Sequence, residues 1–253
     1  MRDLQKKVAL AGSNMSENKK GKLYIFTSYT PGAGKSYRMV ATACEQEDEV
    51  AVGFLNSAHR DMAKLLDDYD VAIGDFSKYS VFGIINESPD AVIFDELGMI
   101  SRNKDSRRLR KKHGHKEKKH ETFIYNDIDT ILDAGINVYA SANLKRFESA
   151  NPVFKAITGI GVKTKVPDEY LEKADKIIFI DREPDLMIAD YKDGSLFVDK
   201  YMKSKIMQKN FLPETLIKYR EASLKYLEQY GDKVEVVFRS GEGKELKDEE
   251  LKD

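Results

Sequence analysis

The stretch that decides the fold is Tyr29-Thr-Pro-Gly-Ala-Gly-Lys35-Ser36. It follows residues 22–28, a run of β-branched and aromatic side chains typical of a strand, and precedes a helical pattern over residues 35–47. A glycine-rich loop between a strand and a helix surrounds a polyphosphate with backbone N–H groups at the positive end of the helix. The stretch therefore predicts a nucleotide-binding site.

The residue types in this loop suit separate tasks in holding phosphates. Gly32 and Gly34 permit the close backbone approach that side chains would prevent. We predict that Lys35 reaches the β- and γ-phosphates and that the Ser36 hydroxyl binds Mg²⁺. The general pattern has glycine where this chain has Tyr29, so an ordinary glycine-rich turn is the alternative. The predicted nucleotide-binding residues of the loop are Thr30, Pro31, Gly32, Ala33, Gly34, Lys35 and Ser36.

A second half of the site follows downstream in Ala91-Val-Ile-Phe-Asp95-Glu96. This apolar strand ends in two carboxylates, at the sheet edge where α/β folds bind ligands. We expect Asp95 to hold Mg²⁺ together with Ser36, and Glu96 to polarise a water that attacks the γ-phosphate. Two exposed acids that begin a loop are the alternative.

A third element is the strand over residues 136–140, which continues into Ser141-Ala-Asn143. In nucleotide-binding proteins with a catalytic glutamate, this strand lies between the Asp-Glu strand and the phosphate-loop strand. A polar residue at its end then faces the γ-phosphate. We predict that Asn143 takes this catalytic position, with Ser141 as the second candidate. An Asn that caps the next turn is the competing interpretation.

Strands alternate with helical patterns along the whole chain, which predicts an α/β fold. We expect a three-layer P-loop NTPase domain of the RecA-like type, with a parallel sheet flanked by helices and a helical C-terminal extension interrupted at Pro213. The predicted organisation is a flexible leader (1–20), a nucleotide-binding domain (21–200), its helical extension (201–231), and a short strand with a mobile charged tail (232–253). The predicted strands are residues 22–28, 49–55, 90–95, 136–140, 176–180 and 233–238.

Composition bounds the class of protein. Of the 253 residues, 41% are apolar and 34% are charged, which excludes a wholly disordered chain. No apolar run approaches the ~20 residues that a membrane-spanning helix needs. Cys44 is the only cysteine, so an internal disulfide is excluded, and we expect a cytoplasmic location.

Charge is segregated along the chain. Residues 102–120 hold ten Lys and Arg against two acids, a segment charge of +8, so the remainder carries −9 within the net −1. A solvated loop is the leading interpretation, and contact with an acidic partner or a nucleic acid is the next. An arginine finger for a neighbouring subunit would come from Arg107, Arg108 or Arg110. Metal binding through His113, His115 and His120 is the least favoured.

Residues 21–227 resemble the cytoplasmic N-terminal domain of the KdpD family of potassium-sensing histidine kinases. The motifs that carry the resemblance are Pro31-Gly-Ala-Gly-Lys-Ser-Tyr37, Phe94-Asp-Glu-Leu97, Leu132-Asp-Ala-Gly-Ile-Asn-Val138, Asn143, Phe147-Glu-Ser149, Ile157-Thr-Gly159 and Val166-Pro-Asp168. The resemblance implies an ATP-binding module that adjusts a two-component system, with a histidine kinase or a response regulator of the KdpE type as its partner. It also implies that any hydrolysis of ATP is slow.

Two segments depart from the family pattern: Gly98-Met-Ile-Ser-Arg-Asn103, and Asn56-Ser-Ala-His-Arg60, which keeps only its arginine. The sequence shows no phosphoacceptor-histidine segment and no kinase lid, so we expect the sensory part without its kinase. Two alternative functions stay open: a stand-alone NTPase or phosphotransferase, and a nucleic-acid-binding or scaffold protein acting through residues 102–120. A homo-oligomer is also among the expected assemblies.

Overall fold

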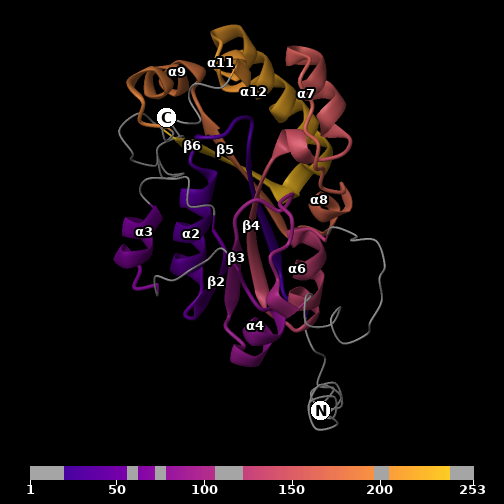
Figure 1. Ribbon diagram of the computed structural model, residues 1–253. Helices are drawn as coiled ribbons and strands as arrows, with labels where there is room; N and C mark the ends of the chain where they lie inside the picture. The colour runs from indigo at the N-terminus through magenta and orange to yellow at the C-terminus, as the bar shows by residue number, and fades with distance from the viewer. Residues whose placement is uncertain (1–19, 56–61, 72–77, 106–121, 197–204, 240–253) are drawn as a thin grey trace.

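The computed structural model describes residues 20–55, 62–71, 78–105, 122–196 and 205–239. Six strands form one parallel sheet in the order β2-β3-β4-β1-β5-β6 (Figure 1). The fold is therefore α/β, as predicted. The strands are β1 (Leu23–Ser28), β2 (Val50–Phe54), β3 (Ala91–Phe94), β4 (Asn137–Asn143), β5 (Lys176–Arg182) and β6 (Val234–Arg239).

Helices cover both faces of this sheet. Figure 1 shows α2 and α3 on one side and α6 and α8 on the other, while α12 packs against α7 and α9. The α-helices are α2 (Lys35–Gln46), α3 (Met62–Asp68), α4 (Val81–Glu87), α6 (Ile124–Asp133), α7 (Ala150–Thr158), α8 (Glu169–Lys173), α9 (Pro184–Asp193), α11 (Lys205–Asn210) and α12 (Pro213–Leu227). Two 3₁₀ turns, η1 (Leu144–Arg146) and η2 (Glu228–Lys233), follow β4 and α12.

The sequence pattern located the strands and the longer helices, and the predicted interruption at Pro213 is confirmed, since α11 ends at Asn210 and α12 begins at Pro213. It did not predict α4, α7, α8 or α9. Each of these has only 5 to 10 residues, and a helical period needs a longer window to stand out from noise. Among the described residues, no helix combines the length and apolarity needed to cross a bilayer.

The order of the strands positions the site. β4 lies between β3 and β1, as expected for a nucleotide-binding sheet with a catalytic glutamate. All four side chains of β3 are buried, and Ser28 at the end of β1 pairs with Asn143 at the end of β4. The carboxyl ends of β1, β3 and β4 therefore meet at one edge, where the glycine-rich loop leaves β1.

Candidate functional site

The glycine-rich loop (residues 29–34) connects β1 to α2 in a conformation that depends on its glycines. Gly32 and Gly34 have φ of 91° and 103°, in the left-handed region that side chains disfavour. Gly34 is the N-cap of α2 and offers no side chain to cap the first turn. The backbone N–H groups at this helix end are therefore directed to the loop interior, which favours an anion there.

Tyr29, the departure from the general pattern, anchors the loop. Its ring is fully buried and lies 6.5 Å from that of Phe179 on β5, and its hydroxyl donates a hydrogen bond to the carbonyl of Arg182. Burial and the nearby Asp181 raise the pKa of this phenol. The tyrosine thus ties the start of the loop to the end of the neighbouring strand, a task that glycine could not perform.

Asp95 receives hydrogen bonds from two elements at the sheet edge. The Ser36 hydroxyl donates to Asp95 Oδ1 over 2.8 Å, and the Ser141 hydroxyl donates to the same oxygen over 2.5 Å. Ser141 in turn accepts a hydrogen bond from the Glu96 backbone N–H (3.0 Å). Asp95 is only 2% exposed. The structure therefore brings together Ser36 and Asp95, which the sequence predicts to share a metal ion.

Glu96 is held by an arginine that sequence reasoning did not identify. Arg146 Nε lies 2.8 Å from Glu96 Oε1, and Arg146 Nη1 donates to Thr164 Oγ1 over 2.7 Å. Glu96 also has φ of 73°, which costs a non-glycine residue about 1 kcal/mol or more. Such conformations concentrate at functional sites. The carboxylate is thus fixed at the sheet edge, and its catalytic role stays a prediction.

Lys145 adds a second cation beside Arg146. Burial, together with the nearby charges of Arg146 and Lys35, lowers the pKa of its ammonium to about 8, and Glu96 acts in the opposite direction. The charged groups that act on Lys145 are two cations and one carboxylate, an excess of positive charge that favours an anionic ligand. The signal in the sequence was the basic pair directly after the strand that ends at Asn143.

Three buried polar atoms at the ends of these strands have no hydrogen-bond partner: Thr30 Oγ1 in the loop, Asn143 Oδ1 at the end of β4, and Glu96 Oε1, whose contact with Arg146 is an ion pair. Asn143 is 5% exposed, and an unsatisfied buried group of this kind costs about 1–3 kcal/mol. The Ser141 hydroxyl, by contrast, is engaged within the Asp95 network. The structure therefore leaves Asn143, rather than Ser141, with spare hydrogen-bonding capacity.

The charged residues at the end of β5 pair with helices. Asp181 is paired with Arg220 of α12 (2.7 Å), and Arg182 is paired with Asp190 of α9. Asp181 and Arg182 therefore fasten α12 and α9 to the sheet, and their charges are engaged there.

Most of the basic segment, with Arg107, Arg108, Arg110 and its three histidines, lies outside the described residues, as do residues 56–60. Its described beginning is built into the fold. Asp105 accepts hydrogen bonds from the Ser80 hydroxyl (2.9 Å) and the Phe82 N–H (3.0 Å), at the start of α4. One of the two acids in the segment is thus structural.

Comparison with known proteins identifies the family. The model of the KdpD family, described as the osmosensitive K⁺ channel His kinase sensor domain, matches residues 19–230. The chain belongs to this family. Both the glycine-rich loop and the Asp95 network lie within the matched KdpD region.

Among curated relatives, the sensor protein KdpD of Clostridium acetobutylicum is 28% identical over 81% of this chain and 23% of its own length. The putative sensor protein KdpD of Synechocystis is 26% identical over 82% of this chain and 55% of its own. The Escherichia coli sensor protein KdpD is 25% identical over 88% and 24%. This KdpD-family chain thus spans between about a quarter and a half of these relatives.

Proposed function

We propose that this chain is a regulatory module that binds a magnesium–nucleoside triphosphate, with ATP the expected nucleotide, in a KdpD-type potassium-signalling two-component system. The observation that carries the proposal is the contact of Ser36 and Asp95 directly beneath the glycine-rich loop. These two residues are 59 positions apart in sequence. Their convergence at a helix N-terminus is the arrangement that a phosphate-bound metal requires.

The residues present fit this ligand. The positive-φ glycines and the first turn of α2 offer backbone donors, and Lys35 offers a buried cation. Ser36 and Asp95 offer oxygen ligands of the kind Mg²⁺ prefers, and the bound metal would neutralise phosphate charge. The unpartnered Thr30 Oγ1 and Asn143 Oδ1 gain partners from a polar ligand or its water shell.

The same edge connects the site to surfaces that a partner can read. Glu96 and Asn143 lie where β3 and β4 end, and each leads directly into a connecting segment. A nucleotide that changes the hydrogen bonds of either residue changes the start of that segment. We infer that a histidine kinase or a response regulator of the KdpE type responds to this change, and that hydrolysis is slow because Arg146 engages Glu96.

Calorimetric titration with ATP and Mg²⁺ tests the proposal. Lys35→Ala should weaken binding about tenfold or more, because a charge-assisted contact to phosphate is lost. Lys173→Ala is the matched control, since this lysine of α8 pairs with Asp129 of α6 and with Glu169 in its own helix, away from the loop. Equal affinities for wild type and Lys35→Ala would contradict nucleotide binding at this loop.

Turnover of the bound nucleotide is a second candidate function, favoured by the position of Glu96 next to Asp95. A stand-alone NTPase or phosphotransferase requires measurable phosphate release that Glu96→Gln abolishes. Phosphate release that is identical in Glu96→Gln and wild type would remove this candidate while leaving nucleotide binding in place.

A further inference from the structure

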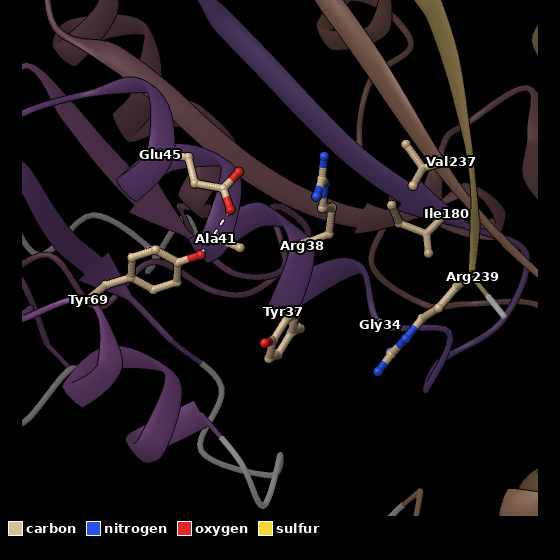
Figure 2. A pocket seen from close by; sticks show the side chains of 9 residues that line it. All are labelled: Gly34, Tyr37, Arg38, Ala41, Glu45, Tyr69, Ile180, Val237 and Arg239. Carbon is tan, nitrogen blue, oxygen red and sulfur yellow. Dashed lines mark hydrogen bonds between the residues drawn. The ribbon is translucent and has the colours of Figure 1, made fainter. Parts of the chain in front are cut away.

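A pocket of about 330 Å³ opens beside the glycine-rich loop, on the flank of α2 (Figure 2). Its walls come from α2, from the residue after α3, and from the ends of β5 and β6. Its volume lies at the lower end of the range for small-molecule sites. The lining residues that matter below are Gly34, Tyr37, Glu45, Tyr69, Val237 and Arg239.

The order of the sheet fixes where this pocket lies relative to the Asp95 network. β1, which carries the loop, has β4 and β3 on one side and β5 and β6 on the other. Asp95 and Ser141 belong to the β3–β4 side, whereas Val237 and Arg239 belong to the β6 side. A linear triphosphate whose terminal phosphate faces Asp95 and Glu96 therefore directs its other end toward the pocket.

Tyr37 and Arg239 form the mouth of the pocket. The Tyr37 ring follows the loop on α2 and is 46% exposed, and the Arg239 guanidinium lies 5.8 Å from its centroid. A Cβ on Gly34 would lie only 2.1 Å from Arg239 Nη1. Because position 34 has no side chain, the guanidinium lies directly against the loop, as Figure 2 shows. An aromatic face and a planar cation are the two surfaces against which nucleobases stack.

The far end of the pocket presents a hydrogen-bond acceptor. Glu45 is eight residues beyond Tyr37, roughly 12 Å along α2 at the helical rise, which is comparable with the length of a nucleoside. Its carboxylate accepts a hydrogen bond from the Tyr69 hydroxyl (2.9 Å), which fixes its position. A carboxylate has further lone pairs for ribose hydroxyls or an exocyclic amine.

We propose that this pocket holds the nucleoside of the bound nucleotide, with the base against Tyr37 and Arg239 and its polar groups directed toward Glu45. The inference rests on the proposed function and extends it: the site selects nucleotides over inorganic polyphosphates, and the β5–β6 side determines which nucleotide is preferred.

The test compares magnesium-loaded ATP with magnesium-loaded inorganic tripolyphosphate by calorimetry. Tyr37→Ala should weaken ATP binding about tenfold and change tripolyphosphate binding by less than about twofold, because only ATP has a base to stack. Tyr37→Phe keeps the aromatic face and should bind ATP like wild type. Val237→Trp, which fills the pocket from β6, should reproduce the selective loss.

The outcomes separate the two proposals. Unchanged ATP affinity in both Tyr37→Ala and Val237→Trp overturns the nucleoside pocket, as does an equal loss for ATP and tripolyphosphate. Neither result affects the phosphate site if Lys35→Ala weakens both ligands. If Lys35→Ala weakens neither, the proposed function fails. Thermal unfolding of each variant shows whether it retains the fold, and Tyr37→Phe serves as the variant closest to wild type.

Discussion

The two sides of the glycine-rich loop are built differently. On the β3–β4 side, Ser36 and Ser141 both donate hydrogen bonds to Asp95, and Arg146 pairs with Glu96. On the β5–β6 side, the Tyr37 ring is nearly half exposed beside a pocket.

This difference separates chemistry from recognition. A buried, mutually bonded network holds its groups in one geometry before any ligand arrives, as phosphate and metal chemistry require. On the β5–β6 side, the exposed Tyr37 ring and the Glu45 carboxylate restrict the geometry of the ligand less. This side can therefore discriminate between ligands by the shape of the group that enters the pocket. We expect substitutions on the β3–β4 side to change metal and phosphate binding, and substitutions on the β5–β6 side to change nucleotide preference.

Asp95→Asn gives the largest expected effect. It removes the charge of the β3–β4 network while keeping the shape of the side chain, so the Mg²⁺-dependent part of ATP affinity should fall about ten- to hundredfold. Titrations with Mg²⁺ and with a chelator measure this part. Asp90→Asn is the control, because Asp90 lies before β3 and accepts a hydrogen bond from Glu49 N–H (2.9 Å). An unchanged Mg²⁺ dependence in Asp95→Asn would make the network purely structural.

Lys145 should make phosphate binding depend on pH. Its pKa is lowered to about 8, so the ammonium is charged below this pH and neutral above it. Because only the charged form attracts phosphate, ATP affinity should fall as pH rises through about 8. Lys145→Met should bind ATP about tenfold more weakly at neutral pH, and its affinity should not fall further near pH 8. Lys145→Arg stays charged and should keep its ATP affinity above pH 8. A wild-type pH profile in Lys145→Met would contradict the assignment.

Arg146→Met tests whether the arginine restrains Glu96. Loss of the 2.8 Å ion pair should free the carboxylate and raise phosphate release severalfold. It should also shift the pH step of Lys145 upward, because Arg146 lowers that pKa. Thr164→Val, which removes only the hydrogen bond from Arg146 Nη1 to the Thr164 hydroxyl, is the matched control. If Arg146→Met released phosphate more slowly than wild type, or if the pH at which ATP affinity falls did not change, Arg146 would have no restraining role.

Tyr69→Phe gives the smallest expected effect. It removes the hydroxyl that fixes Glu45 at the far end of the pocket and leaves the ring in place. ATP affinity should change by about fivefold or less, since one partly exposed hydrogen bond contributes about 1 kcal/mol or less. Parallel titrations of Tyr69→Phe and Tyr37→Ala measure the difference. If Tyr69→Phe lost as much ATP affinity as Tyr37→Ala, the main recognition contact would be made by Glu45 and not by Tyr37.

The β3–β4 side was largely predictable from the sequence, because its residues follow directly from strand ends. Ser36 comes after the β1 loop and Asp95 after β3, and parallel strands bring their carboxyl ends to one edge. No knowledge of side-chain conformation was needed to predict that they meet. The same logic placed Asn143, whose unpartnered oxygen only the structure reveals.

The remaining contacts depend on packing between distant segments. Arg146 meets Glu96 fifty positions away through the turn of η1, and neither residue type signals the other. Arg239 reaches Gly34 only because β6 pairs with β5 at the sheet edge, so that its last residue arrives beside the loop. These contacts follow from the order of strands and the direction of side chains, which sequence periodicity does not encode.

The central place of β1 has a consequence for synthesis of the protein. β1 begins at residue 23, but its neighbours in the sheet begin at residues 137 and 176. At translation rates of about 5–20 residues per second, the first neighbour emerges roughly ten seconds after β1 itself. During that interval an apolar, aromatic strand has no sheet to join on the ribosome. The element that carries the glycine-rich loop is thus the first of these strands to be made, and it waits for the fourth and fifth strands before both of its edges are paired.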